Sequence, residues 1–362
     1  MNLYDKKVLK EILDAGKPVL IYGNAQYAIE TCIFLQKNNV LVESFVVDAF
    51  VDIVKEKIEG VPVRRISTYV TDLENYIIVI GFCNIEKSRV LLGLEKLLRC
   101  KVYRIWEPVV FCDWDDTFWK SHEKEFENVY NFLYDEKSKK VLKALIESRR
   151  RGEVSNLLFL SEDRQYFNEL TYEVESEEEI FMDCGAFNGD TIEKYDSFTS
   201  RKYKKIYAFE PCRENMLLLK EKVNKMHNVV LINKGTWNCN AELSFVNSSS
   251  NSQIDDNGEE RIAVTSIDDV LKGEKVTFIK MDVEGSEWQS LQGAIGTLQK
   301  WMPKLAICVY HKADDIIKII DFLKDIKNSE KQYRFFLRHH SNAAYETVLY
   351  AIPVNKSYKI QK

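Results

Sequence analysis

The segment FMDCGAFNGDT, residues 181–191, constrains the fold of this chain more than any other feature. A short apolar run ends in Asp183, a turn carries Gly185 and Gly189, and a helix-like segment begins directly after the second glycine. Glycines let the backbone approach a bound group closely, and a helix N-terminus adds N–H donors. A strand, a glycine turn and a helix start in this order predict a nucleotide-type pocket in an α/β fold.

Polar residues also end three further apolar runs. KIYAFE ends in Glu210, VTFIKMD ends in Asp282, and LAICVY is followed by His311. In nucleotide-binding βαβ units an acid about 20 residues beyond the glycine turn holds the ribose, and Glu210 lies slightly further along. The carboxyl ends of parallel strands share one edge of a sheet, and ligands bind there. We therefore expect Asp183 and these three side chains to converge at one edge.

Each of these residues also has a purely structural interpretation. Glu210 could be a solvated acid at a strand end, and His311 could make a structural hydrogen bond. Glu284 and Glu287 fit the start of the helix that follows VTFIKMD, where negative charge is favourable. Asp282 is the strongest site candidate of this loop.

From about residue 179 to residue 353 the chain resembles the FkbM family of S-adenosylmethionine-dependent methyltransferases. The matching segments are FMDCGAFNGDTIEKY, KIYAFEPCREN, VVLINKGTWN, VTSIDDV, VTFIKMDVEGSEWQSLQGA, PKLAICVYHK and ETVLYAIP. KMDVEGSEWQSLQGA is the most specific of them, because it is long and unusual among methyltransferases. The resemblance covers roughly half of the chain. It implies a class I, Rossmann-like α/β methyltransferase domain with a mostly parallel seven-stranded sheet, and family members are mostly O-methyltransferases of sugars, glycans or polyketides.

The resemblance also implies site residues, position by position. S-adenosylmethionine would be bound by Asp183, Gly185, Ala186, Gly189, Asp190, Thr191, Glu210, Pro211, Gly235, Trp237 and Asp282. Glu210 would hold the ribose, and residues 234–237 would lie near the adenine. The catalytic residues would be His311, Asp282 and Glu284. Two positions depart from the family: Phe187 stands where Asn is common, and Asn238 stands where an acid is common.

Methyl transfer to a hydroxyl requires alignment and removal of a proton. The cofactor carries the hard step, so the enzyme must place the acceptor in line and accept its proton. His311 is one candidate base, because an imidazole titrates near neutrality. Asp282 is the rival, or it orients the base. Two carboxylates on one loop could also hold Mg²⁺, but the sequence has no dense set of acidic ligands, and we predict no metal site.

Composition restricts the setting of the protein. The chain has 362 residues, a net charge of −5 and 45% hydrophobic residues, which suits two domains with large cores. No basic block indicates a nucleic-acid partner, and no apolar run has membrane-spanning length. The eight cysteines lack C-x-x-C or metal-like spacing, and the N-terminus has no signal-peptide pattern. We therefore expect reduced thiols in a cytoplasmic protein.

The sequence divides into three predicted regions, at residues 1–110, 111–176 and 177–362. The first has apolar strands at residues 18–22, 41–48, 75–81 and 102–106. Their alternation with helical patterns predicts a small, parallel, Rossmann-like sheet. Its glycine turn has Gly23 but lacks the further glycines of a dinucleotide site, so a pyrophosphate would have little room. We interpret this region as a docking or substrate-recognition module, or as a structural domain that allows homo-oligomers.

Two other segments could contribute to the site. The middle region has apolar residues at helical spacing, and Arg164, Gln165 or Tyr166 could contact the acceptor. Tyr166 could equally be a core residue. The polar segment 247–260 lies between two candidate strands and could act as a lid.

The sequence thus predicts a cytoplasmic O-methyltransferase that uses S-adenosylmethionine and acts on a small-molecule or glycan hydroxyl, including those of sugars and nucleotide sugars. One alternative is a non-catalytic sugar-nucleotide-binding or scaffold subunit of a polysaccharide pathway. Another is a methyltransferase of a small polyketide-like or nitrogen acceptor.

Overall fold

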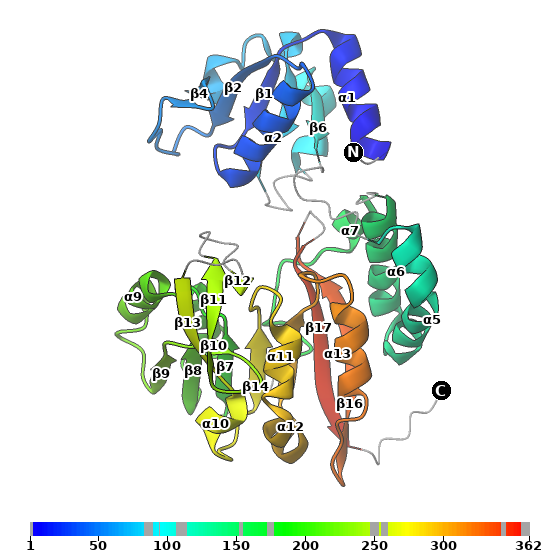
Figure 1. The fold of residues 1–362 in the computed structure, drawn as a ribbon. Helices are drawn as coiled ribbons and strands as arrows, with labels where there is room; N and C mark the ends of the chain where they lie inside the picture. The colour runs from blue at the N-terminus through cyan, green and yellow to red at the C-terminus, as the bar shows by residue number, and fades with distance from the viewer. Residues whose placement is uncertain are drawn as a thin grey trace. The chain divides into compact units, whose positions relative to one another are not determined.

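The structure is a computed structural model that describes residues 3–82, 90–93, 95–105, 114–151, 155–171, 177–246, 253–254, 260–341 and 345–355. Its contacts divide the chain into two compact units. Unit 1 comprises Met1–Ser121, Lys140–Asp163 and His339–Tyr345; unit 2 comprises His122–Lys139, Arg164–Arg338 and Glu346–Lys362. Figure 1 labels most of the elements of both units.

Unit 1 is built around a six-stranded sheet in the order β3-β4-β2-β1-β5-β6. The strands are β1 (Val19–Tyr22), β2 (Val42–Val47), β3 (Lys57–Ile58), β4 (Val61–Arg65), β5 (Ile77–Ile80) and β6 (Lys101–Arg104). The α-helices of its first part are α1 (Leu3–Ala15), α2 (Gln26–Lys37) and α4 (Glu95–Leu98). The four predicted strands of this region correspond to β1, β2, β5 and β6.

Both faces of this sheet are buried, which explains why its strands are apolar at successive positions. Along β1, Val19 and Ile21 join one hydrophobic cluster together with residues of α1 and α2. Leu20 and Tyr22 join a second cluster on the other face. Successive side chains of a strand point to opposite faces of the sheet. When both faces are covered, every position is buried, and the strand has apolar residues without alternating polar ones.

The prediction of a purely parallel sheet is wrong at one edge. β3 runs antiparallel to β4, so the sheet is mixed. The two strands are joined by Glu59 and Gly60, whose φ angles are +49° and +77°. Two positive φ angles in succession are typical of the two-residue type I′ hairpin turn. The two strands are short, and the dipeptide Glu59-Gly60 is the sequence feature that indicates the turn between them.

The predicted helical region contains α5 (Asp116–Phe132), α6 (Glu136–Arg151) and α7 (Ser155–Leu160). In unit 2, the residues at the start of α6 contact strand β16 (Lys331–His339). The guanidinium of Arg338 donates two hydrogen bonds to the carboxylate of Asp135, at 3.2 and 2.6 Å. The hydroxyl of Ser138 accepts the N–H of Leu337 at 2.9 Å. A bidentate pair of this kind fixes the orientation of both partners.

Unit 2 contains a seven-stranded sheet in the order β16-β17-β15-β14-β7-β8-β9. The other strands are β7 (Ile180–Cys184), β8 (Lys205–Phe209), β9 (Val229–Ile232), β14 (Phe278–Met281), β15 (Lys304–Cys308) and β17 (Thr347–Asn355). In this order, the neighbouring strands β15, β14, β7, β8 and β9 are parallel to one another, and β17 is antiparallel to β15. The mostly parallel seven-stranded sheet of the class I methyltransferase fold is therefore confirmed.

The register of this sheet brings the predicted site residues to one edge. Cys184 at the end of β7 lies opposite both Phe209 of β8 and Met281 of β14. Glu210 and Asp282 each follow directly, so they stand beyond the ends of β8 and β14, on either side of the turn that follows β7. This is the edge that open α/β sheets use for ligands.

Helices cover both faces of the sheet in unit 2. They are α8 (Asp190–Phe198), α9 (Arg213–Lys222), α10 (Ile267–Leu271), α11 (Glu287–Gln292), α12 (Ile295–Trp301) and α13 (Asp315–Leu323). Apolar side chains of α8 and α9 pack on the sheet in the main hydrophobic cluster. Helices α11 and α13 lie side by side (Figure 1). Phe167 packs into the same cluster against the rings of Phe181 and Phe278, which anchors the segment that carries Tyr166.

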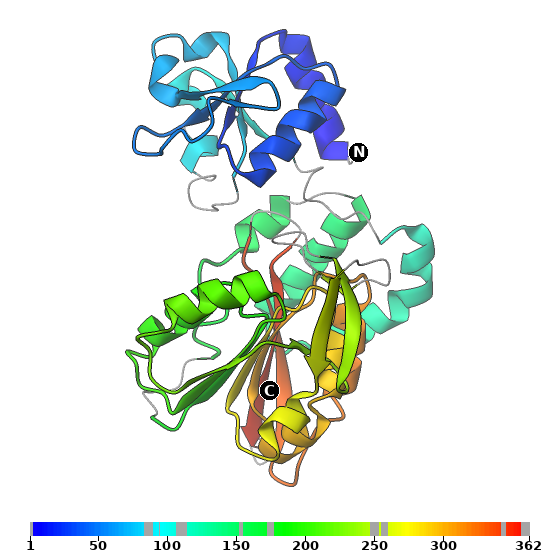
Figure 2. The same ribbon diagram turned by 60° about the vertical axis from the view of Figure 1, so that its left-hand side comes forward.

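A second, four-stranded sheet in unit 2 has the order β10-β13-β11-β12. Its strands are β10 (Gly235–Thr236), β11 (Ala241–Val246), β12 (Gln253–Ile254) and β13 (Glu260–Thr265). Figure 2 shows these yellow-green strands standing apart from the green strands of the main sheet. Of the predicted lid at 247–260, residues 247–252 and 255–259 lie outside the described residues.

Candidate active site

The glycine turn after β7 is held tightly against the neighbouring strand ends. Gly185 has φ +83°, and a Cβ there would meet the carbonyl oxygen of Asp282 at 1.9 Å. The N–H groups of Gly185 and Ala186 donate to the carbonyl of Phe209, at 3.1 and 2.9 Å. Gly189 has φ +85° and is the N-cap of α8. Only glycine fits the first position, because two backbones meet there at contact distance.

We expected the backbone N–H groups of this turn to be available to a ligand, but most of them already donate to groups of the protein. The N–H of Gly189 donates to the carbonyl of Ala186 at 2.8 Å. The N–H of Asp190 donates to the side-chain oxygen of Asn188 at 3.1 Å. The turn satisfies these donors itself because it is short and tightly folded. Its rigidity, and not a row of free donors, is what it offers to a bound group.

Glu210 is held in place by backbone groups on both of its oxygens. Oε2 accepts the N–H of Phe187 and Oε1 accepts the N–H of Cys212, each at 2.9 Å. Burial raises the pKa of this carboxyl, and the N–H of Cys212 acts in the opposite direction. An ionised carboxylate offers about four acceptor positions. The side-chain amide of Asn215 also donates to Oε1, at 3.4 Å, so it is Oε2 that keeps capacity for one further donor, such as a sugar hydroxyl.

Asp183 lies in the interior and already has a cationic partner. Its carboxylate is fully buried, 2.9 Å from the ammonium of Lys280 on the adjacent strand β14. The same ammonium donates to the carbonyl of Gly185 at 2.8 Å. Burial raises the pKa of Asp183 to about 6, while Lys280 lowers it. For Lys280, burial alone would lower the pKa, but Asp183 and Asp282 raise it above its usual range. The pair thus links β7, β14 and the glycine turn.

Asp282 is the centre of the cluster at this edge. The hydroxyl of Tyr166 donates to Oδ2 at 2.9 Å, and that of Tyr310 donates to Oδ1 at 3.3 Å. Burial alone would raise the pKa of Asp282, but Lys280 and His311 lower it. The carboxylate is therefore ionised at neutral pH and oriented by two phenols. Tyr166 is buried, as its apolar context suggested, yet its hydroxyl belongs to the site.

His311 is surrounded by carboxylates. Its Nε2 lies 3.3 Å from Glu284 and 3.6 Å from Asp282, and its Nδ1 lies 2.9 Å from the fully buried Glu287. Burial alone would lower the pKa of His311, but the charge of Glu287 and the contacts with Glu284 raise it well above its usual value. In this arrangement the imidazole is a cation among acids. A protonated imidazole cannot accept a proton, which counts against His311 as the base in this state.

The carboxyl groups around this cluster exceed what its cations can neutralise. Burial and the charge of Glu287 raise the pKa of Asp315 to about 7. Burial and the charge of Asp282 raise the pKa of Glu346 to about 7. Lys280 is shared with Asp183, so the part of the edge around His311 has negative character. It would hold a cationic or neutral group more readily than an anion.

Comparison with known proteins identifies the domain that carries this cluster. Residues 183–335 match the model of the methyltransferase FkbM domain. This part of the chain is an FkbM methyltransferase domain. All three predicted catalytic residues, and all the predicted cofactor residues, lie inside the matched range.

Solved structures support the fold of the chain. The crystal structure of methyltransferase FkbM from Methylobacillus flagellatus KT has a TM-score of 0.66 and 20% identity, over 95% of this chain and 92% of that chain. At this identity the likeness shows the fold alone. SMU.1697c from Streptococcus mutans, solved with SAH, has a TM-score of 0.34 and 16% identity, over 50% of this chain and 92% of that chain. That score is too low for an inference about this chain. No curated protein matches the sequence.

The segment predicted near the adenine borders both sheets of the FkbM domain. A Cβ on Gly235 would lie 3.3 Å from Val264 and 3.8 Å from Pro211, so Gly235 and Pro211 are neighbours. Trp237 packs against the cluster of the small sheet, and its N–H donates to the carbonyl of Thr265 at 2.8 Å. Thr191, the remaining predicted residue, is buried in the first turn of α8.

Sequence reasoning missed several residues of this cluster. Lys280 is the clearest, because it interrupts an apolar strand that is buried on both faces, and such a charge needs a partner. Glu287 was interpreted as a helix-start acid, and it does accept the N–H of Val283 at 3.0 Å, but it also contacts His311. Glu346 gave no signal, since it is 35 residues from His311 in the sequence, and Asp315, four residues after His311, gave none because it reads as an acid at the start of α13.

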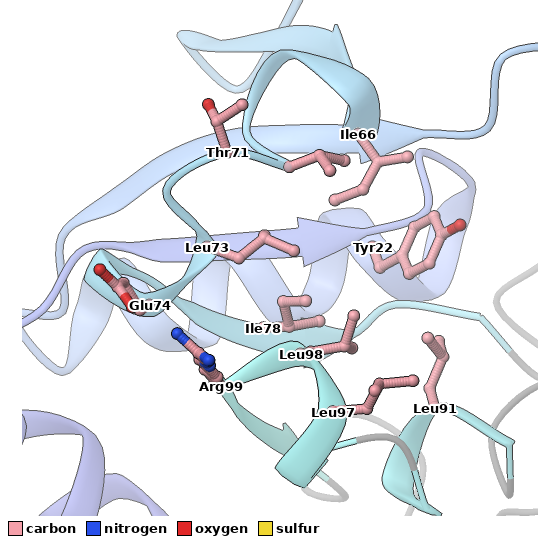
Figure 3. Close-up of a pocket in the computed structure, with 11 residues that line it drawn as sticks. Tyr22, Ile66, Thr71, Leu73, Glu74, Ile78, Leu91, Leu97, Leu98 and Arg99 are labelled. Carbon is pink, nitrogen blue, oxygen red and sulfur yellow. The ribbon is translucent and has the colours of Figure 1, made fainter.

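Unit 1 contains a separate cavity that differs in character. Its volume is about 560 Å³, and apolar side chains such as Leu73, Ile78 and Leu98 point into it, with Glu74 and Arg99 at one side (Figure 3). It has no cluster of acids and imidazole among its lining residues. Within the part of the chain that the structure describes, no helix has both the length and the apolar character to cross a bilayer.

The dinucleotide-type turn of unit 1 is closed. A Cβ on Gly23 would meet the carbonyl oxygen of Gly81 at 2.6 Å, so two strand ends meet where a pyrophosphate would need room. Asp48 follows β2, at the place of a ribose-binding acid, and it accepts the hydroxyl of Tyr22. Both observations favour the interpretation that this unit is not a dinucleotide site.

Proposed function

We propose that this methyltransferase uses S-adenosylmethionine to methylate a hydroxyl of a glycan, a sugar or a nucleotide sugar. The observation that carries the proposal is the common edge of the sheet, where Glu210 follows β8 and the Asp282–His311 cluster follows β14 and β15, with the glycine turn of β7 between them. One part of this edge suits a ribose, and the other suits a reacting hydroxyl. A pocket with both parts is what a two-substrate transferase needs.

The residues at this edge fit the cofactor on their own chemistry. Glu210 is fixed by two backbone N–H groups and the amide of Asn215, and it keeps acceptor capacity on Oε2, which suits a hydroxyl of a ribose. Gly235 and Pro211 lie next to it, where a flat base would find backbone and apolar surface. The acids at Asp282 and beyond suit a sulfonium and an ammonium group. Asp183 would act through Lys280 and the turn, because its carboxylate is fully buried.

When bound, the cofactor would supply an electrophilic methyl group on a positively charged sulfur. That methyl group would pass to the acceptor oxygen and leave a neutral thioether, while Glu210 and the turn after β7 would hold the cofactor. The hydroxyl proton leaves to a base of the chain. We assign this proton to Asp282, because its carboxylate is ionised and oriented by Tyr166 and Tyr310. Glu284 and His311 orient the acceptor from the other side.

The charge of the site refines the acceptor class. The acids around His311 would repel a phosphate placed next to them, so a neutral hydroxyl suits the reacting position better than a phosphorylated one. A nucleotide sugar remains compatible if its diphosphate lies away from this cluster. The same excess of acid favours a second candidate, an amine acceptor, since a protonated amine would be attracted here.

Methyl transfer to an acceptor panel tests the proposal. The full chain is incubated with methyl-labelled cofactor and neutral glycosides, nucleotide sugars or amines, and products are identified by mass spectrometry. A labelled methyl ether supports the proposal, and a labelled methylamine supports the second candidate. A protein that binds the cofactor and methylates neither class would contradict both. Failure to bind the cofactor at millimolar concentration would favour the scaffold alternative.

For the remaining parts of the chain, the proposal keeps the division into regions at residues 1–110, 111–176 and 177–362. The first region would serve docking, acceptor recognition or self-association in the cytoplasm. The closed turn at Gly23 and the engaged Asp48 support this over a dinucleotide role. Size-exclusion chromatography with light scattering measures whether the chain forms homo-oligomers, and deletion of residues 1–110 tests whether they depend on this region.

A further inference from the structure

The geometry around His311 goes beyond a set of ion pairs. One ligand atom from each of Asp282, Glu284 and His311 lies within 4.8 Å of the other two. The Nε2 atom of His311 is 3.3 Å from Glu284 and 3.6 Å from Asp282. Around an ion with bonds of about 2.1 Å, adjacent ligand atoms are about 3.0 Å apart and opposite ones about 4.2 Å. The two distances from Nε2 lie within this range, so the imidazole and the two carboxylates are close enough to share one small cation.

We propose that Asp282, Glu284 and His311 bind one divalent metal ion. A nitrogen and two carboxylate oxygens suit a first-row ion such as Mn²⁺ or Zn²⁺ better than Mg²⁺, which prefers oxygen alone. This proposal departs from the sequence-based expectation of no metal, which rested on the absence of a dense acidic motif. The ligands come from two loops, after β14 and after β15, so no short motif contains them.

The ring of His311 supplies the observation that points to a ligand. Its side chain is only 10% exposed, and neither ring nitrogen makes a hydrogen bond of good geometry despite the close contacts. A buried nitrogen without a well-formed hydrogen bond is costly unless something else binds it. Nε2 faces the carboxylates of Asp282 and Glu284, and an ion bound between the three groups would satisfy this nitrogen.

The surrounding residues provide the outer support that metal sites have. Nδ1 of His311 lies 2.9 Å from the fully buried Glu287, on the side away from Glu284 and Asp282. A carboxylate behind a metal-binding histidine fixes its tautomer and raises its basicity. Tyr166 and Tyr310 orient Asp282 in the same way. Glu284 has φ +52°, a costly backbone conformation that often occurs at functional sites.

The site is open enough to accept both an ion and an acceptor. The side chains of Asp282 and Glu284 are 23% and 35% exposed. Three protein ligands leave coordination positions free, as in catalytic metal sites. If the proposed function holds, an acceptor hydroxyl in such a position would lose its proton more easily, which would relieve the demand on Asp282 as a base. Metal binding itself does not depend on that function.

Direct binding of Mn²⁺ tests the proposal without cofactor or acceptor. The full chain is stripped with a chelator and desalted, and Mn²⁺ is titrated while the electron paramagnetic resonance signal of the free ion is followed. We expect one equivalent to bind at sub-millimolar Mn²⁺. Pulsed spectra of the bound ion should show the nitrogen coupling of an imidazole ligand, a readout that requires no substitution.

Variants locate the ion. Glu284→Gln and His311→Gln should each weaken Mn²⁺ binding by at least about 10–100-fold, the loss that even outer-shell changes cause. Asp314→Asn is the matched control: this acid is close in sequence and similarly exposed, at 31%, but pairs with Lys318. It should leave binding unchanged. Two results would overturn the proposal. One is no binding at millimolar Mn²⁺. The other is Mn²⁺ that binds without nitrogen coupling and whose affinity is the same in Glu284→Gln as in the wild type. The assay contains neither cofactor nor acceptor, so failure of the metal proposal can be told apart from failure of the proposed methyltransferase function.

Discussion

At the residue scale, the buried pair of Lys280 and Asp183 makes the strongest demand on the fold. Both side chains are almost completely buried, at 3% and 0% exposure. Removing one partner of a buried pair leaves an uncompensated charge, at a cost of about 3–5 kcal/mol. Lys280→Met should therefore lower the free energy of unfolding by this amount, measured by urea denaturation.

A double variant separates charge from packing at this pair. Lys280→Met combined with Asp183→Asn removes both charges, so it should regain a large part of the lost stability. A double variant no more stable than Lys280→Met alone would show that the charge of Asp183 is not the cause.

Phe187 is strained, and its strain can be relieved. It has φ +47° and is 38% exposed, although aromatic residues rarely adopt this conformation. The left-handed conformation costs most residues about 1–2 kcal/mol, and Asn tolerates it better. Phe187→Asn should raise the thermal midpoint, as followed by circular dichroism. A lower midpoint would mean that the packing of the ring outweighs the strain.

Most individual site residues could be predicted from the sequence, but their contacts could not. Asp282 and His311 stand at strand ends, which the apolar pattern reveals. The contact of His311 with Glu287 depends on how α11 lies beside β15, and no spacing rule states that. Asp183 was expected beside the cofactor, and its burial with Lys280 follows from strand register instead.

At the scale of elements, the turn after β7 depends on the absence of one side chain. A Cβ on Gly185 would meet the carbonyl oxygen of Asp282 at 1.9 Å, so Gly185→Ala must displace one of the two loops. Gly273 is the control, with φ +86° and only a lysine tip at 3.4 Å. Gly273→Ala should lose only about 1–2 kcal/mol from the left-handed conformation. Gly185→Ala should lose more in urea unfolding; equal losses would contradict the close approach.

The contact between the start of α6 and β16 has a pH-dependent part. Burial alone would raise the pKa of Asp135, but hydrogen bonds from Arg338 and Ser138 lower it. The stabilisation is therefore fully present above the pKa of the unfolded state, about 3.9, and is lost as the pH falls through the lower pKa of the folded state. Asp135→Asn should cost about 1.5–3 kcal/mol at pH 7, as for hydrogen bonds to a charged group.

The pH dependence of that difference checks its origin. Urea unfolding of the wild type and Asp135→Asn should differ less below about pH 4, because the wild-type carboxyl is then increasingly protonated. Glu136→Gln, at an exposed acid that pairs with Lys139, is the control and should have little effect at either pH. A difference that stays constant from pH 7 to pH 3 would contradict an ionic origin.

Long apolar strands were predictable, and short edge strands were not. The strands of both main sheets that carry continuous apolar runs are found close to their expected positions. The hairpin of β3 and β4 was missed because two- and five-residue strands show little periodicity, and Glu59-Gly60 is a weaker hairpin signal than Asn-Gly or Asp-Gly.

At the scale of the whole molecule, the central claim is that S-adenosylmethionine binds at the edge of the FkbM domain through Glu210. Isothermal titration calorimetry of the full chain tests it most directly, with thermal unfolding as a check that each variant is folded. Glu210→Gln removes one charge-assisted acceptor, and a hydrogen bond to a charged group is worth about 1.5–3 kcal/mol. The control is Glu274→Gln, an acid of unit 2 that pairs with Lys205 outside this edge.

We expect one cofactor molecule to bind per chain. Binding should be at least tenfold weaker in Glu210→Gln, since about 1.4 kcal/mol corresponds to that factor, and unchanged in Glu274→Gln. No binding at millimolar cofactor, or equal affinity of Glu210→Gln and the wild type, would contradict the central claim.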